Sequence, residues 1–183
     1  MGKDLFVVKM SDMNDLRERN KVIQIIMQNM GIIYKVANIY CKNQEDKKDL
    51  VQEIMTQLWS SFERYDDAYK IGTWIYRVAL NIAISFYRKN LTMEKHFLPI
   101  DEKLAIMYDN KDEDEDETQK FTLLEKFISE LKEFDKALML LYLEKKSHQE
   151  ISEILGISTS NVSTKLARIR EGLKRRFSDY KNQ

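Results

Sequence analysis

The side chains best suited to recognising another molecule lie along one predicted helix near the C-terminus. Ser160, Thr164, Arg168, Glu171 and Arg175 recur every three or four residues, so a helix would present them on one side. Hydroxyl and guanidinium groups arranged in this way can hydrogen-bond to base edges in the major groove of DNA. Basic residues around them would add an attraction to phosphate that weakens with salt. They are Lys165, Arg170, Lys174 and Arg176.

The residues before and within this helix predict how it is held. Ser147 and Glu150 have capping-box spacing, so a first helix is expected to begin at His148 and to end at Gly156 in the left-handed conformation. Ser158 can cap the second helix. One apolar stripe runs along that second helix: Val162, Leu166, Ile169 and Leu173. Two helices joined by so short a turn predict a helix-turn-helix, although a helical hairpin with a solvated basic face has the same pattern.

A second candidate group lies on an earlier predicted helix, residues 73–89. Its core stripe is expected to be Ile71, Ile75, Val78, Ile82 and Phe86. Beside that stripe lie Trp74, Arg77, Asn81 and Arg88. Unpaired bases stack on aromatic rings and phosphates pair with arginine, so this flank suits single-stranded nucleic acid. A tryptophan next to a core stripe is also commonly part of the core, and the pattern leaves both interpretations open.

The sequence contains no spacing that predicts catalysis, a metal or a cofactor. His96 and His148 are far apart and lack companion cysteines at ligand spacing, and there is no glycine-rich phosphate loop. The lone Cys41 rules out an internal disulfide. No apolar run approaches the roughly 20 residues of a membrane span, and the N-terminus lacks a signal-peptide pattern. We therefore expect a cytoplasmic protein that is not an enzyme and does not insert into membranes.

Composition and charge predict an all-α fold in two parts. Among 183 residues there are only five glycines and one proline, which favours long helices. Further helices are expected over 12–41, from Asp46, from Gln119 and over 134–143. The acidic run of residues 109–117 is expected to be disordered. The prediction is an N-terminal domain of residues 1–90, an acidic flexible linker of residues 91–118, and a C-terminal helix-turn-helix domain of residues 119–183.

The order of these segments resembles bacterial RNA polymerase sigma factors of the compact, two-domain extracytoplasmic-function type. DLVQE, residues 49–53, is similar to the helix with which the family binds core polymerase. WIYRVALNIAISFYRK, residues 74–89, is similar to its promoter-melting segment. The segment of residues 147–177 resembles its DNA-reading helix-turn-helix. Without the resemblance, the polar side of the helix from Asp46 is explained equally well as an ordinary solvated face.

The resemblance implies roles for individual residues. Asp49, Gln52 and Glu53 would bind core polymerase. The minus-ten element would be held by Tyr65, Trp74, Arg77, Asn81 and Arg88. The minus-thirty-five element would be read by Ser163, Thr164, Ala167 and Arg168, with Asn161 and Lys165 near phosphate. The implied partners are core polymerase, promoter DNA and an anti-sigma protein, with the chain monomeric outside the holoenzyme. Residues 112–117 could be a simple tether or a nucleic-acid mimic.

The sequence departs from the family pattern at a few positions. Ser85 stands where the family usually has aspartate, Lys132 follows Leu131 where a proline is common, and Ser163 and Ala167 replace residues that are often basic or bulky. The DNA preference is therefore open. Two other classes remain possible: a dimeric regulator that uses the same helix-turn-helix on a palindromic operator, and a polymerase-binding inhibitor whose acidic run occupies a basic channel.

Overall fold

The computed structural model describes residues 20–94 and 115–181, and within these ranges all regular structure is helical. The N-terminal unit begins with helical residues 20–28 and continues with α2 (Met30–Tyr40), α3 (Gln44–Ser61), the 3-10 turn η1 (Phe62–Arg64) and α4 (Ile71–Glu94). The C-terminal unit contains α5 (Glu115–Ser129), α6 (Glu133–Leu143), α7 (His148–Leu155) and α8 (Thr159–Lys181). The predicted all-α fold is confirmed. No helix in the described ranges is long and apolar enough to cross a lipid bilayer.

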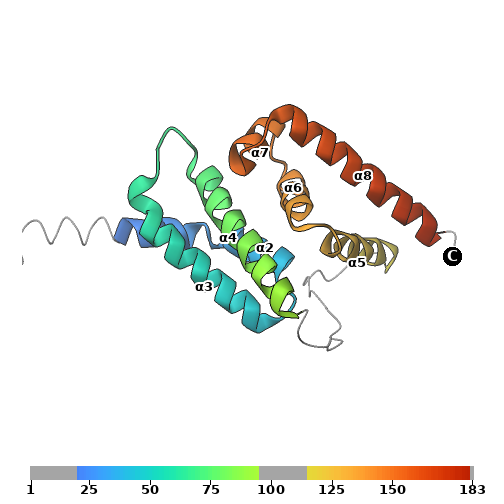
Figure 1. Ribbon diagram of the computed structural model, residues 1–183, viewed down its shortest axis with the longest axis horizontal. Coiled ribbons are helices and arrows are strands. Elements are labelled where there is room, and N and C mark those ends of the chain that lie inside the picture. The colour runs from blue at the N-terminus through green and yellow to red at the C-terminus, as the bar shows by residue number, and fades with distance from the viewer. Residues whose placement is uncertain (1–19, 95–114, 182–183) are drawn as a thin grey trace, which may run out of the picture.

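The centre of the N-terminal unit is α4, which contacts α2 and α3 and also reaches α6 and α7 (Figure 1). Its fully buried side chains are Ile75, Tyr76, Ala79, Leu80 and Ala83. Of the predicted core stripe only Ile75 is fully buried, whereas Ile71, Val78, Ile82 and Phe86 are half-exposed. These four half-exposed side chains still pack against the core, so the predicted stripe lies along the edge of the buried surface. The sequence analysis did not predict that Tyr76, Ala79, Leu80 and Ala83 form the rest of that surface.

Helix ends differ from the predictions where polar side chains bond locally. The predicted helix over 12–41 is interrupted at Asn29, whose side-chain amide donates to the Ile25 carbonyl at 2.8 Å. Its first part, residues 12–19, lies outside the described residues. The next helix begins at Gln44 and not at Asp46, because the side chain of Asn43 accepts from the Asp46 amide at 2.7 Å and caps it.

The helices extend into the segment that the sequence assigned to the linker. α4 continues to Glu94, and α5 begins at Glu115 and so includes the last three residues of the acidic run, which were expected to be disordered. Carboxylates are favoured at a helix N-terminus by the helix dipole, which accounts for this start. The rest of the acidic run lies outside the described residues. The domain boundaries at 90 and 118 stay a prediction.

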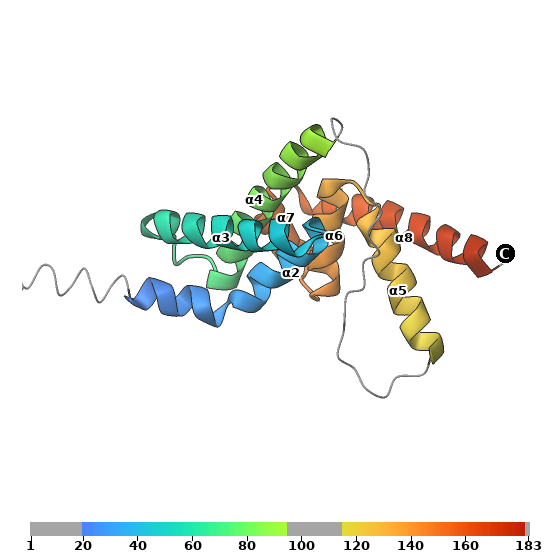
Figure 2. The ribbon, with the colours of Figure 1, turned by 90° about the horizontal axis from the view of Figure 1, so that it is seen from below.

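In the C-terminal unit α8 packs on α5, α6 and α7 and lies along the outer edge of the unit (Figure 1). Figure 2 shows α8 extending past α6 and α5 to the C-terminus. α8 contacts α7 and α6 near its start and α5 near its end. At that end the Phe127 and Phe177 rings pack edge to face, with centroids 5.0 Å apart. Arg176 pairs with Glu130 and its guanidinium lies 4.1 Å from the Phe127 ring centre. The last turns of α8 are therefore fastened to α5.

Candidate nucleic-acid interface

The corner between α7 and α8 is built by side-chain hydrogen bonds that the sequence predicted. The Ser147 hydroxyl accepts from the Glu150 amide at 3.1 Å, and the Glu150 carboxylate accepts from the Ser147 amide at 2.9 Å, which completes the capping box. The Ser147 hydroxyl also donates to the Glu150 carboxylate at 3.0 Å, and the bonds from the Ser147 amide and hydroxyl hold the pKa of Glu150 below its ordinary value. Gly156 ends α7 with φ 67°, and the Ser158 hydroxyl accepts from the Asn161 amide at 3.3 Å. The predicted helix-turn-helix is confirmed.

α8 buries one side and exposes the other. Val162, Leu166, Ile169 and Leu173 are at most 8% exposed and face the rest of the unit. Most of the predicted groove-facing residues are exposed, namely Asn161, Ser163, Thr164, Ala167 and Arg168. Thr164 donates its hydroxyl proton to the Ser160 carbonyl at 2.9 Å, so it would offer DNA a lone pair and a methyl group. The exposed side of α8 can therefore enter a major groove.

The basic residues of α8 divide into free and engaged groups. Arg168 and Arg175 line an open concavity of about 800 Å³ between α8 and the start of α6. Lys165 also lines it, with its ammonium 5.6 Å from the Phe134 ring centre. Arg176 lines the concavity too, but it is held against α5 by Glu130 and Phe127. The Arg170 guanidinium lies 5.4 Å from the Tyr142 ring centre. We therefore expect Arg168 and Arg175 to contribute more to DNA affinity than Arg176.

The second candidate site is an aromatic cluster where η1 meets the start of α4. The Tyr65 and Trp74 ring centres are 5.3 Å apart, and Phe62 lies 5.8 Å from Tyr65 and 5.9 Å from Trp74. The Tyr65 hydroxyl donates to the Tyr69 carbonyl at 2.6 Å and fixes the loop. Trp74 is half-buried, so it both packs on the core and shows part of its ring. Phe62 completes this cluster and was not among the candidate residues predicted from the sequence.

The remaining predicted minus-ten residues are spread along α4. Arg77 and Asn81 are exposed one and two turns beyond Trp74. Arg88 is 14 residues beyond Trp74, about 21 Å along a helix. Its Nε donates to the Glu133 carboxylate of the C-terminal unit at 2.9 Å. The structure thus brings Tyr65 and Trp74 together but does not bring Arg88 to them.

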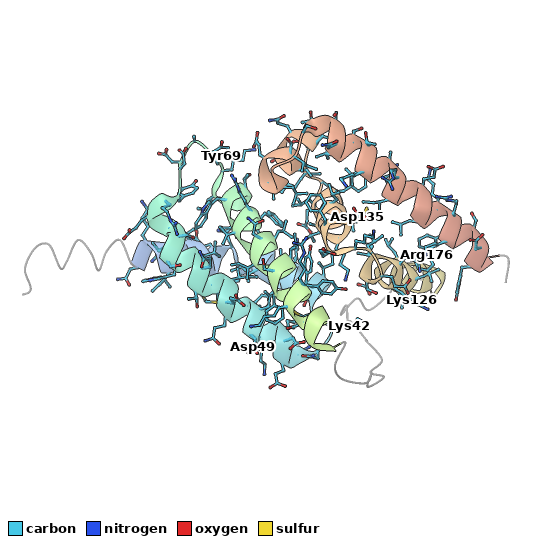
Figure 3. All side chains as sticks on the ribbon, viewed as in Figure 1. Lys42, Asp49, Tyr69, Lys126, Asp135 and Arg176 are labelled. Atoms are coloured by element: carbon cyan, nitrogen blue, oxygen red, sulfur yellow. The ribbon has the colours of Figure 1, made fainter. Side chains whose placement is uncertain are left out.

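The proposed polymerase-binding residues lie on the outer side of α3. Asp49, Gln52 and Glu53 are exposed, whereas Leu50, Ile54 and Leu58 are fully buried. Figure 3 shows Asp49 on the side of α3 that faces away from the C-terminal unit. Trp59 on the same helix is a large apolar side chain that is 40% exposed. This face is accessible to a protein partner.

Comparison with known proteins places both units in one family. Residues 25–91 match the family model Sigma-70 region 2, and residues 121–173 match Sigma-70, region 4. The chain is similar to RNA polymerase sigma factor SigV of Bacillus subtilis (strain 168), with 32% identity over 136 residues, 74% of this chain and 78% of that protein. It is also similar to the ECF RNA polymerase sigma factor SigW of the same organism, with 27% identity over 167 residues, 80% of this chain and 83% of SigW.

A solved structure with the same fold is the sigma factor RpoE in complex with the anti-sigma factor NepR from Bartonella quintana. Its TM-score is 0.68 at 15% sequence identity, over 83% of this chain and 93% of that one. The helix-turn-helix unit, the α4 unit and these likenesses define an RNA polymerase sigma factor. More narrowly, the chain belongs to the extracytoplasmic-function (ECF) sigma factors, which bind core RNA polymerase and direct it to promoter DNA.

Proposed function

We propose that three separate surfaces of this sigma factor divide the work of transcription initiation. Asp49, Gln52 and Glu53 on α3 bind core polymerase, and the exposed side of α8 reads the minus-thirty-five element. The aromatic cluster with Arg77 and Asn81 holds the displaced minus-ten strand. The N-terminal domain would span residues 1–90 and the helix-turn-helix domain residues 119–183. The chain supplies positioning and no chemistry of its own, and it works in the cytoplasm alongside the polymerase.

The observation that carries this proposal is the division of exposed groups between the two units. Aromatic rings that can stack on bases gather at Tyr65 and Trp74, whereas α8 offers hydroxyl and guanidinium groups in a helix that fits a groove. Single strands are recognised by stacking and duplex DNA by hydrogen bonds to base edges. The two surfaces therefore suit the two states of promoter DNA that an initiating polymerase must hold.

An anti-sigma protein is a further proposed partner. The solved RpoE structure contains the anti-sigma factor NepR, and this chain shares its fold. The exposed apolar side chains Ile23, Met27 and Tyr34 belong to the first helices of the N-terminal unit and are 46–59% exposed. Such residues are suited to a protein contact. A pull-down with the cytosolic part of a candidate inhibitor, followed by loss of promoter-specific transcription, would test this partner.

Run-off transcription with purified core polymerase tests the main proposal. The wild-type chain should start RNA at a cognate promoter, which neither a repressor nor a polymerase inhibitor would do. Asp49→Ala should weaken holoenzyme assembly about tenfold while leaving promoter preference intact. Asp179→Ala, which removes an exposed carboxylate at the far end of α8, is the matched control. If Asp49→Ala and the control formed holoenzyme equally well, Asp49 would not be part of the polymerase-binding site.

A further inference from the structure

The proposed function does not use the concavity that lies between α8 and the start of α6. Residues 131–135 of α6 and its entry line one wall, and α8 residues between Lys165 and Arg176 line the other. Ile169 and Leu173 also line it, and both are nearly fully buried, so they form its apolar base. Arg168 lines it as well, although its exposed side chain belongs to the side of α8 proposed to read DNA. The concavity therefore adjoins the surface that would meet the duplex.

The charged groups of this concavity leave an excess of positive charge. Its cations are Lys132, Lys165, Arg168, Arg175 and Arg176, and its carboxylates are Glu133, Asp135 and Glu171. Glu133 is paired with Arg88 of the N-terminal unit at 2.9 Å, and Arg176 is paired with Glu130 of α5. Without these two paired groups, four cations face two carboxylates. The concavity therefore attracts an anion.

Lys132 is the cation that the start of α6 adds to this set. It is exposed, and within residues 20–94 and 115–181 no ion pair joins its ammonium to a carboxylate. It stands where sigma factors of this type commonly have proline, and its φ of −62° is the value that proline requires. The backbone at this position therefore suits proline, and the fold does not need the lysine side chain. The ammonium group is available for binding.

The dimensions of a helix in a major groove place DNA phosphates at this concavity. An α-helix with its side chains is about 10–12 Å across and the groove is about 12 Å wide, so the two sugar-phosphate backbones run along the flanks of the helix. The groove-facing row of α8 passes through Thr164 and Arg175, opposite the buried Leu166. Lys165 and Arg176 each follow that row by one position, about 100° around the helix. The concavity lies on that flank, where one backbone would run.

We propose that this concavity binds the sugar-phosphate backbone of one DNA strand beside the element that α8 reads. Lys132 binds a phosphate from the α6 wall, and Lys165 and Arg175 bind phosphates from the α8 wall; these three residues are here named the phosphate seat. The inference rests on the proposed entry of α8 into a major groove. Phosphate contacts fix the orientation of a protein on the duplex and carry no sequence information. A contact from α6 thus sets the angle of α8 in the groove and adds affinity for DNA of any sequence.

Substitutions of Lys132 in the full-length chain test the phosphate seat. The probe is a labelled duplex of random sequence, about 30 base pairs long, and binding is followed by fluorescence anisotropy as the KCl concentration is varied. Each phosphate contact contributes ~0.9 to the slope of log affinity against log salt, so Lys132→Gln should flatten the slope by ~0.9 and weaken binding about five- to tenfold near 0.1 M salt. Lys132→Pro should have the same effect, and Lys132→Arg should retain the wild-type slope.

Lys126→Gln is the matched control, because it makes the same charge change at an exposed position on α5. It should leave the slope at the wild-type value. An equal loss in this control would mean that net charge alone is responsible and would overturn the phosphate seat. Unchanged affinity and slope in Lys132→Gln would overturn it as well. Since Lys132 is exposed, thermal unfolding of its variants should match wild type.

Two further measurements separate the phosphate seat from other uses of the same concavity. If Lys132→Gln weakened binding to a cognate promoter duplex but not to random sequence, Lys132 would read a base and the proposal would be wrong. If it weakened core-polymerase binding and left DNA binding intact, the concavity would hold an acidic protein surface, which also contradicts the proposal. If the wild-type chain failed in run-off transcription while Lys132→Gln still flattened the salt slope, the proposed function would fail and the phosphate seat would stand.

Discussion

α4 and α8 are the longest helices of their units, with 24 and 23 residues, yet they are used differently. α4 is contacted by four helices, and its candidate minus-ten residues lie on the flank of a broadly buried surface. α8 buries one row of side chains, has half-buried residues such as Lys165 and Arg176 beside that row, and exposes its opposite side. We therefore expect stability and DNA contact to be coupled in α4 and separable in α8. The predictions below test that difference, beginning with the largest expected effect.

The first prediction tests which side of α4 is the core. Ile75→Ala should reduce the free energy of unfolding by ~2–5 kcal/mol, because Ile75 is fully buried and its removal leaves a cavity. Ile82→Ala removes the same atoms from a half-exposed site and should cost well under half as much. Urea unfolding measures both values. Equal losses would mean that the buried side of α4 includes the row predicted from the sequence.

The second prediction compares one DNA-contact residue from each unit. Trp74→Ala should make the free energy of promoter opening ~1–3 kcal/mol less favourable, because a base loses its stacking partner. It should also destabilise the fold, because the Phe62 and Tyr65 rings lose a partner. Arg168→Ala should weaken minus-thirty-five recognition by ~1–3 kcal/mol with no change in the unfolding midpoint. Run-off transcription and thermal unfolding separate the two effects. A stability loss in Arg168→Ala would contradict the separation.

The third prediction concerns two glycines of the helix-turn-helix. Gly156→Ala forces an alanine into the left-handed conformation at φ 67° and should cost ~1–2 kcal/mol. Gly172→Ala lies inside α8, where an added methyl group meets no neighbouring atom, and should stabilise by ~0.5–1 kcal/mol. Both are read from denaturant midpoints.

The smallest expected effect is the loss of stability in acid that comes from the capping box at the start of α7. The folded-state pKa of Glu150 lies below its ordinary value of 4.5, mainly because the Ser147 amide donates to it. The unfolded chain therefore takes up the proton first as the pH falls. The stabilising contribution is complete above 4.5 and is lost as the pH drops through the folded-state pKa. Glu150→Gln should lose less stability than wild type between about pH 7 and about pH 3 in urea titrations.

The sequence predicted the helix-turn-helix nearly residue by residue because its determinants are local. A helix cap, a left-handed glycine and an apolar stripe each depend on residues at most four positions apart. Ser147, Gly156 and Val162 could therefore be assigned before any packing was known. The full width of the buried side of α4 was not predictable in this way. Its buried side depends on which helices surround it, and Ala79 and Ala83 carry too little apolar surface to stand out in a periodic pattern.

The contacts between the units were also outside the reach of sequence patterns. Glu133, Glu144 and Lys136 look like ordinary surface residues of a helix, and only their position opposite Arg88, Lys35 and Tyr87 gives them a role. The site residues themselves could be named because a family resemblance supplied their order. Whether each of them contacts polymerase or DNA stays a prediction.

The fastening of α8 to α5 has a mechanical consequence. α5 is the first helix after the segment that leaves the N-terminal unit, and it grips the last turns of α8 through Glu130 and Phe127. A shift of α5 would therefore be passed directly to α8, the helix that we propose to enter the DNA groove.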